Sequence, residues 1–301
     1  MSNKKVIVIT GPTGSGKTDI SLKIAEIING EIINSDASQF KKDLNIGTAK
    51  LDLTKTNIKH HLIDFLDADK NYSIKDFQEN GRKIIDDIIS RGKTPMVVGG
   101  TGLYINALLY DYNLTDDERD PNFEIKYQDV NNHDLHEMLK DLDNESYQNI
   151  HENNRRRVLR ALEKALSEKE KTLEKHELLY DALILSLNTD REILYSRINK
   201  RVELMFDAGW IDECLLLKKN ENIDITKIKD IGYPEVFSYL DGKLEKEEMY
   251  DIIKQKTRNY AKRQITWFKN KLNCTWIDMD YNNPYKTLET VKEIVIEFLE
   301  K

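Results

Sequence analysis

Cysteine is scarce in this sequence of 301 residues, and the two present, Cys214 and Cys274, lie far apart. Their spacing argues against a disulfide framework and against a zinc site built from cysteines. The six histidines show no HExxH or other metal-ligand spacing, and we interpret the adjacent His60 and His61 as structural residues. These absences exclude small disulfide-rich scaffolds and zinc fingers.

Long apolar runs are missing as well. No stretch of 18 apolar residues occurs, so the sequence predicts no transmembrane helix. The opening residues, MSNKKVIVIT, run directly into a predicted strand and leave no room for a signal peptide. Internal repeats and low-complexity linkers are also absent. We therefore expect a cytoplasmic protein with no membrane partner.

The charge balance is slightly acidic but uneven along the chain. Lys and Arg number 46 against 53 Asp and Glu, which gives a net charge of −7 and argues against indiscriminate nucleic-acid binding. Hydrophobic content of 39% and charged content of 33% are typical of a globular protein with a heavily charged surface. Acidic residues concentrate in 111–152, whereas basic residues cluster in 155–164 and 254–271.

The most informative stretch is VIVITGPTGSGKTDISLKIAEII, residues 6–28. It matches the pattern G-x-x-x-x-G-K-[ST] in full and lies between an apolar strand and an amphipathic helix, as a phosphate-binding loop requires. Backbone N–H groups and the helix N-terminus surround phosphate, Lys17 neutralises it, and the Thr18 hydroxyl is suited to bind Mg²⁺. The predicted phosphate-binding residues are Gly11, Pro12, Thr13, Gly14, Ser15, Gly16, Lys17 and Thr18.

Strand and helix patterns alternate along most of the chain. Apolar segments that indicate strands recur at residues 6–10, 31–35, 60–67, 95–98, 182–187 and 274–277. This alternation predicts a mostly parallel α/β sheet flanked by helices. Residues 112–181 contain no convincing strand and show helical patterns near 133–142 and 154–168. We therefore expect an α/β core formed by 1–111 and 182–301 and a helical insertion at 112–181.

The second predicted strand delivers Asp36 and Gln39 to its carboxyl end, where doubly wound sheets bind ligands. An ATPase or GTPase usually has an acid after an apolar strand to hold Mg²⁺, but the strand at 95–98 ends in Gly-Gly-Thr-Gly. Asp36 is therefore the candidate acid near the phosphates. This argues against hydrolysis and leaves a small-metabolite kinase open, because such an acid could accept a hydroxyl proton.

Three groups of basic residues have two interpretations each. On a helix, Arg156, Arg157 and Arg160 would contact phosphate or form a solvated charged face. Arg197 and Arg201, four residues apart, would clamp a diphosphate or pair with nearby acids. Residues 254–271 interleave basic and aromatic side chains, which suits RNA. Their Trp and Phe side chains are equally typical of a helix packed into a core, and we favour the core.

Several further motifs occur in a fixed order. They are D-x-S-Q after the second strand, NIGTAK, HHLID, VGGTGLY, NNRRRVLRALE, LYSRINKRVELM, IGYPE and TRNYAKRQITWFK. With GPTGSGKT, this ordered set resembles the bacterial tRNA dimethylallyltransferases from about residue 8 to 270. The resemblance implies a P-loop NTPase-like core and transfer of a dimethylallyl group to N6 of the adenine 3′ of the anticodon.

The resemblance also implies roles for individual residues. The phosphate loop would hold dimethylallyl diphosphate with Mg²⁺, and Arg201 would reach the departing diphosphate. Asp36 would be the general base, Thr101 would lie at the reacting centre, and Ser38 and Gln39 would hold a flipped adenine. The implied tRNA-binding residues are Asp36, Ala37, Ser38, Gln39, Thr101, Arg156, Arg157 and Arg160. The helical insertion would grip the anticodon stem.

The sequence departs from the family pattern at three positions. Ala37 and Phe40 lack hydroxyls that the family commonly has, and Pro234 stands where a basic residue is usual. The cysteine and histidine spacing of a eukaryotic C-terminal zinc finger is absent, so a bacterial-type enzyme is expected. We also expect a monomer, because a closed core and a monovalent RNA partner require no second copy. The alternatives are an isopentenyltransferase acting on free adenine nucleotides, a P-loop metabolite kinase, and a nucleotide-gated RNA-binding module.

Overall fold

A computed structural model describes residues 4–112, 120–166 and 174–301. The chain forms two compact units, Met1–Asp111 with His176–Lys301 and, separately, Tyr112–Lys175. The insertion expected at 112–181 therefore includes His176–Asp181, which belong to the first unit. Residues 113–119 and 167–173 of that expected insertion lie outside the described residues.

A six-stranded sheet forms the centre of the first unit, in the order β3-β2-β4-β1-β7-β8. Every pair of neighbouring strands in this sheet is parallel, which confirms the predicted α/β class. The strands are β1 (Lys5–Thr10), β2 (Gly30–Asn34), β3 (His60–His61), β4 (Thr94–Val98), β7 (Asp181–Asn188) and β8 (Thr275–Asp278).

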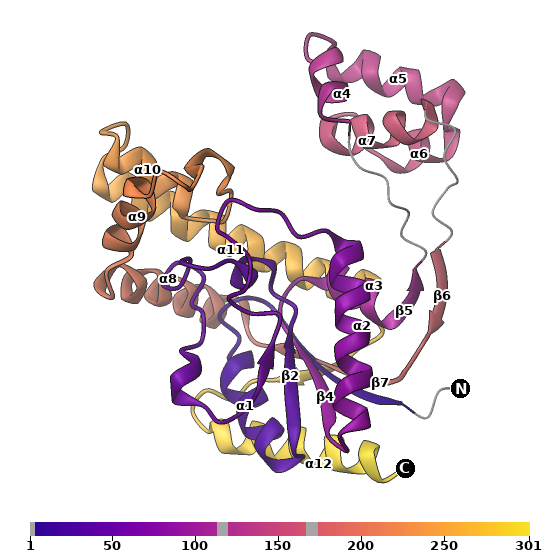
Figure 1. Cartoon of the computed structure of the whole chain (residues 1–301), viewed down its shortest axis with the longest axis vertical. Helices are drawn as coiled ribbons and strands as arrows, with labels where there is room; N and C mark the ends of the chain where they lie inside the picture. Colours follow the sequence, from indigo (N-terminus) through magenta and orange to yellow (C-terminus); the bar gives the residue numbers. More distant parts are fainter. Residues whose placement is uncertain (1–3, 113–119, 167–173) are drawn as a thin grey trace. The chain divides into compact units, whose positions relative to one another are not determined.

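Helices cover both faces of this sheet (Figure 1). Successive side chains of a strand point to opposite faces, so Val6 and Val8 of β1 pack on one side and Ile7 and Ile9 on the other. The Val face packs against α2 (Ile74–Ser90) and α3 (Gly102–Leu109), and the Ile face against α1 (Lys17–Ile27) and α12 (Pro284–Glu300). The near-continuous apolar sequence of β1 follows from this burial on both faces.

A second hydrophobic core of the first unit lies among helices. Trp210 and Tyr233 are among its largest fully buried side chains. The helices are α8 (Arg191–Asp207), α9 (Trp210–Lys219), α10 (Tyr233–Leu240) and α11 (Lys246–Lys271). Short 3₁₀ helices occur at Ala37–Phe40 (η1), Leu53–Lys55 (η2) and Ile225–Lys227 (η3). Among the described residues, none of the helices combines the length and apolarity that a membrane crossing requires.

The second unit is helical and has its own core, which includes Leu135, Leu139, Val158 and Leu162. Its helices are α4 (Pro121–Lys126), α5 (Asn132–Leu142), α6 (Asn144–Asn149) and α7 (Arg155–Leu166). Arg155, the first arginine of the basic run, donates to the carbonyls of Val130 at 2.6 Å and Tyr127 at 2.5 Å. Its guanidinium therefore fastens α7 to the α4–α5 connection.

Two predictions of strands were wrong. The strand predicted at 60–67 ends at His61, because Leu62 and Asp64 have φ of 55° and 56°, in the left-handed region that no strand contains. The prediction of no strand in 112–181 misses β6 (Glu174–Leu178), which pairs with β5 (Tyr110–Tyr112). The sequence of β6, EKHEL, carries three charged residues and lacks the β-branched pattern of a buried strand.

Candidate functional site

The loops that follow β1, β2 and β4 meet at the carboxyl edge of the sheet. The Ser35 N–H donates to the Val98 carbonyl at 2.8 Å, and the Thr101 N–H donates to the Ser35 carbonyl at 3.2 Å. The Thr10 hydroxyl donates to the Gly99 carbonyl at 2.9 Å. These bonds bring together the phosphate loop, Asp36 and Thr101, as expected for a site at the carboxyl ends of parallel strands.

The phosphate loop turns tightly between β1 and α1. Gly16, which precedes α1, has φ of 88°, a conformation that glycine adopts without strain. A Cβ at Gly11 would lie 2.6 Å from the Leu187 carbonyl oxygen, so this position has no room for a side chain. The Lys17 ammonium bends back onto the loop and donates to the carbonyls of Gly11 at 2.9 Å and Pro12 at 2.8 Å.

Asp36 lies directly before η1 and is half-buried. Its carboxylate accepts the Ser38 N–H at 3.2 Å. Burial raises the pKa of Asp36, although the positive charges of Lys17 and Arg201 oppose the shift. Burial also lowers the pKa of Lys17 to about 8 and lowers the pKa of Arg201. The site thus holds an unusually basic carboxylate between two cations.

Thr101 contacts the Asp36 segment through its side chain. The Thr101 hydroxyl accepts the Ala37 N–H at 3.4 Å. Tyr260 of α11 hydrogen-bonds with Thr101, and burial together with the charge of Asp36 raises the pKa of the Tyr260 phenol. Thr101 therefore joins the loop after β2 to α11.

Arg197 and Arg201 of α8 both reach the phosphate loop. Arg201 Nη1 donates to the Thr13 hydroxyl at 3.3 Å, and Arg197 Nε donates to the Gly14 carbonyl at 3.0 Å. The Arg197 guanidinium also lies 3.8 Å from the centre of the Tyr281 ring. Both arginines therefore lie at the phosphate loop, and Glu203, one of the acids that could have paired with them, bonds with Lys254 at 2.9 Å.

Two cavities share the residues Thr13, Asp36 and Arg201. A cavity of about 740 Å³ is lined by residues of the phosphate loop, including Lys17 and Thr18, and by Gln39 and Arg197. A cavity of about 300 Å³ is lined on its other sides by residues of α8, α9 and α11, including Trp210, Tyr260 and Arg263. Asp36 is therefore accessible from a cationic phosphate cavity and from a second, partly aromatic one.

The remaining residues of the Asp36 segment differ in their surroundings. Ser38 lines the 300 Å³ cavity, and the Gln39 amide nitrogen donates to the carbonyls of Thr48 at 3.2 Å and Ala49 at 3.4 Å. Phe40, by contrast, is buried in the core and stacks on Tyr104 with ring centres 5.7 Å apart. The departure from the family pattern at Phe40 therefore concerns packing in the core.

Sequence reasoning missed Gln264, which is buried beside the phosphate loop. Its Oε1 accepts the Thr13 N–H at 2.9 Å, and its Nε2 donates to the Gly100 carbonyl at 2.9 Å. The only signal was its place in the motif TRNYAKRQITWFK. Phe268 of the same motif is fully buried, as the core interpretation predicted.

The arginines predicted to contact tRNA lie on α7 of the second unit. Arg156 and Arg157 are exposed, whereas Arg160 is half-buried and donates to Glu163 at 2.8 Å. The run NNRRRVLRALE therefore contains one arginine that holds the unit together, Arg155, and two that face solvent.

The donor set at the phosphate loop fits Mg²⁺. Among the described residues, no three His, Cys, Asp or Glu side chains come together as metal ligands. Mg²⁺ needs no such cluster, because it is commonly held by one or two protein oxygens and by substrate phosphates. The Thr18 hydroxyl and the Asp36 carboxylate supply oxygens at the walls of the 740 Å³ cavity.

Comparison with known proteins agrees with this geometry. The family model described as IPP transferase matches residues 39–271. The chain belongs to the IPP transferase family. This finding confirms the resemblance seen in the ordered motifs, and it includes the segments that carry Gln39, Thr101 and Arg201.

Relatives in the IPP transferase family match along nearly the whole chain. A tRNA dimethylallyltransferase of Bacillus velezensis is 43% identical over 99% of this chain and 98% of its own length. The crystal structure of a full-length tRNA isopentenylpyrophosphate transferase from Bacillus halodurans is 37% identical with a TM-score of 0.75, over 99% of this chain and 97% of that one. A eukaryotic dimethylallyltransferase acting on tRNA is 30% identical with a TM-score of 0.82, over 98% of this chain and 79% of its own.

Proposed function

We propose that this chain is a tRNA dimethylallyltransferase. It transfers the dimethylallyl group of dimethylallyl diphosphate to N6 of the adenosine 3′ of the anticodon and releases diphosphate. The names of its relatives support the reaction and the tRNA substrate. The observation that carries the proposal is that Asp36 lines both cavities, so that one carboxylate faces a phosphate-binding space and a second binding space.

The larger cavity supplies the diphosphate side of the reaction. Lys17, Arg197 and Arg201 bring three positive charges to its wall, and loop N–H groups and the α1 N-terminus add partial charge. Charge builds on the leaving oxygen as the C–O bond breaks, and fixed cations stabilise that charge. Mg²⁺, held by the Thr18 hydroxyl with Asp36 nearby, would neutralise further charge on the diphosphate.

The smaller cavity supplies the adenine side. The exocyclic amine attacks the prenyl carbon as the bond to diphosphate breaks, and Asp36 accepts the proton that N6 loses. An adenine stacked in a loop cannot reach a carboxylate at the wall of a cavity, so the base must turn out of its stack. Ser38 lines this cavity, Gln39 lines the larger cavity that shares Asp36 with it, and Thr101 contacts the Asp36 segment through the Ala37 N–H. The raised pKa of Asp36 makes its carboxylate a better proton acceptor than an ordinary aspartate.

Three arginines of α7, the exposed Arg156 and Arg157 and the half-buried Arg160, provide a test of tRNA binding. Replacing Arg156, Arg157 and Arg160 together with alanine should weaken tRNA binding and flatten its salt dependence, the slope falling by roughly one for each phosphate that the protein no longer neutralises. Equilibrium binding across a series of salt concentrations measures both effects. Lys140→Ala on α5, which removes an exposed charge from the same unit, is the matched control. An unchanged salt slope in the triple variant would show that these arginines form a solvated charged face and do not contact tRNA phosphates.

Nucleoside mass spectrometry separates the proposed function from its alternatives. The protein is incubated with Mg²⁺ and dimethylallyl diphosphate, with unmodified tRNA in one tube and AMP in another. A dimethylallyl mass gain on adenosine from tRNA alone is the expected result. A gain on AMP alone would identify an adenine-nucleotide isopentenyltransferase. No gain in either tube, with transfer of labelled phosphate from ATP, would identify a kinase.

A further inference from the structure

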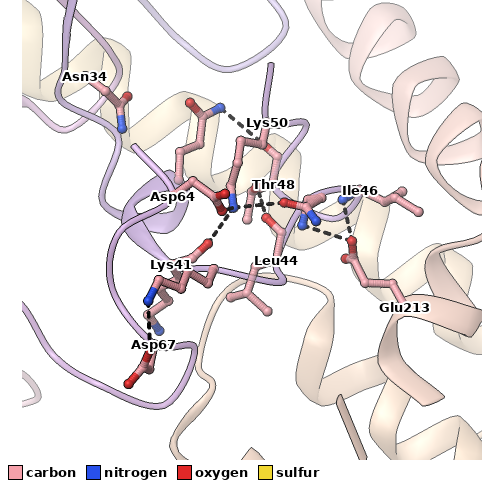
Figure 2. A network of polar contacts seen from close by, with 12 residues as sticks. Asn34, Lys41, Leu44, Ile46, Thr48, Lys50, Asp64, Asp67 and Glu213 are labelled. Carbon is pink, nitrogen blue, oxygen red and sulfur yellow. Dashed lines mark hydrogen bonds and ion pairs between the residues drawn. The ribbon is translucent and has the colours of Figure 1, made fainter. Parts of the chain in front are cut away.

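A single carboxylate of α9 accepts hydrogen bonds from three consecutive backbone N–H groups of the 44–50 loop, which lies between η1 and η2. Glu213 Oε2 accepts the N–H of Asn45 at 2.9 Å and of Ile46 at 2.7 Å, and Oε1 accepts that of Gly47 at 3.3 Å. The Tyr233 hydroxyl adds a fourth bond at 2.7 Å. Figure 2 shows the Glu213 carboxylate directed at the loop.

Packing reinforces this attachment. Gly47 lies against the Trp210 indole so closely that a Cβ at this position would overlap the ring. Trp210 is fully buried and begins the helix that carries Glu213. The first turn of α9 therefore holds the loop twice, through an apolar contact and through a charged hydrogen-bond acceptor.

The far end of the same loop sets the orientation of Gln39. Its side-chain amide nitrogen donates to two carbonyls, those of Thr48 at 3.2 Å and Ala49 at 3.4 Å. A carbonyl accepts hydrogen bonds and does not donate them, so only the NH₂ group of Gln39 can face the loop. The amide oxygen is consequently turned away from the loop and left as an acceptor. Gly47 and Thr48 also line the 300 Å³ cavity beside Asp36.

Lys50, the last residue of the loop, anchors it to neighbouring segments through its ammonium group. The Lys50 side chain is 5% exposed, and its ammonium donates to the Lys41 carbonyl at 2.5 Å and to Asp64 at 2.6 Å (Figure 2). The Thr48 hydroxyl donates to the Leu44 carbonyl at 2.5 Å. With both ends fixed, the middle of the loop depends on Glu213 for the partners of its N–H groups.

We propose that Glu213 is a positioning residue for the adenine side of the reaction, acting through the 44–50 loop on the Gln39 amide. The inference rests on the proposed function for what Gln39 faces, but the attachment of the loop is independent of it. Loss of the carboxylate leaves three N–H groups without their acceptor, and the loop carbonyls that orient Gln39 then shift. The contacts of Arg197 and Arg201 with the phosphate loop do not pass through this segment.

The first test reads the loop itself, without any assay of activity. Hydrogen exchange measured by mass spectrometry should be faster at residues 45–47 in full-length Glu213→Ala than in the wild type, and unchanged in β1 and β4. Asp212→Ala removes an exposed carboxylate from the same turn and is the matched control. Unchanged exchange in the Glu213 variant would overturn the attachment, whatever reaction the protein performs.

The second test is a double-mutant cycle on dimethylallyl transfer. Glu213→Ala should lower kcat/KM for tRNA roughly tenfold to a hundredfold, as expected when a reactive group shifts by about 1 Å, while KM for dimethylallyl diphosphate changes less than about twofold. Added to Gln39→Ala, the same substitution should cost less than about threefold, because the residue it positions is already gone. Multiplying effects in the double variant would overturn action through Gln39.

Two conservative variants guard against a loss of folding. In Glu213→Gln the amide oxygen still accepts from Asn45 and Ile46, while its NH₂ faces the Tyr233 hydroxyl and the Gly47 N–H, which loses its acceptor. Two of the three loop bonds remain, so part of the activity lost in the alanine variant should return. Tyr233→Phe removes one bond to the carboxylate and leaves the three loop bonds, so it should change transfer by less than about threefold. A glutamine variant as impaired as the alanine variant, at equal thermal stability, would contradict the proposal.

Discussion

Strand β2 places a carboxylate near each of its ends, and the two side chains have different surroundings. Glu31, its second residue, is 1% exposed and accepts both terminal nitrogens of Arg91 at 2.5 and 2.7 Å. Lys93 at 2.9 Å and His61 at 2.8 Å complete the cluster. These partners, the Arg91 hydrogen bonds first, hold the pKa of Glu31 well below its usual range.

Asp36, two residues beyond the end of β2, has far fewer partners. Its carboxylate accepts the Ser38 N–H, and its cationic neighbours Lys17 and Arg201 also contact the phosphate loop. Burial prevails here and raises the pKa of Asp36. Burial alone therefore does not decide the reactivity of a carboxylate. A buried carboxylate that has all its partners stabilises the fold, and one that lacks them remains available to take a proton.

Asp36→Asn should have the largest effect on the transfer rate. It should also distinguish Asp36 most clearly from Glu31, because it lowers the rate without lowering the stability. Loss of a general base lowers the rate of dimethylallyl transfer by roughly 10²- to 10⁴-fold. The stability at neutral pH should stay equal or rise, because a carboxyl whose pKa is raised in the folded state disfavours folding when ionised. Steady-state transfer and thermal unfolding measure the two quantities. Unchanged turnover would show that Asp36 is not the general base.

Glu31→Gln should show the opposite pattern. Removing one partner of a buried ion pair leaves cations uncompensated and lowers the free energy of unfolding by about 3 kcal/mol. The transfer rate of the folded fraction should remain close to that of the wild type. Denaturant unfolding measures the loss, and Glu26→Gln, an exposed position on α1, is the control expected to change stability by less than about 0.5 kcal/mol.

The pH dependence of this loss gives a further check on Glu31. A carboxyl whose folded-state pKa is lowered stabilises the protein fully above its ordinary pKa, about 4.3, and the contribution declines as the pH falls through the folded-state value. The stability difference between wild type and Glu31→Gln should therefore shrink below about pH 4. A difference that stays constant as the solution is acidified would contradict the assignment.

The smallest expected effect concerns Lys17, the cation shared by the phosphate loop and Asp36. Its pKa of about 8 means that it loses its charge as the pH rises through that value. The ratio kcat/KM for dimethylallyl diphosphate, which reports groups of the free enzyme, should then decline on the alkaline side. Lys17→Arg should remove the decline, since arginine keeps its charge. A decline centred near 10 would show that burial does not perturb Lys17.

Much of the site was predictable because its parts are local in sequence. Gly11–Thr18 form one motif, and Asp36 follows a short apolar strand whose carboxyl end must face the same edge of the sheet. Arg201 was predicted from its spacing to Arg197 and from the family resemblance. Sheet class, most strand positions and most helices followed from periodicity for the same reason.

What the sequence did not reveal depends on side chains that meet across long stretches of chain. Gln264 bonds the phosphate loop from 251 residues away, and Glu213 bonds the 44–50 loop from 168, 167 and 166 residues away. Neither residue has a local pattern that distinguishes it from other polar residues on a helix. The strand predicted at 60–67 failed for a related reason, because the left-handed residues Leu62 and Asp64 have no distinctive sequence signature.

The most direct test of the account is the pH dependence of a single turnover of dimethylallyl transfer to unmodified tRNA, in the wild type and in Asp36→Asn. The wild-type rate should rise with pH along a limb whose midpoint lies above the ordinary aspartate pKa of about 3.9. The variant should be slower and should lack this limb. The same limb in both enzymes would show that another group takes the proton from N6, and would contradict the account.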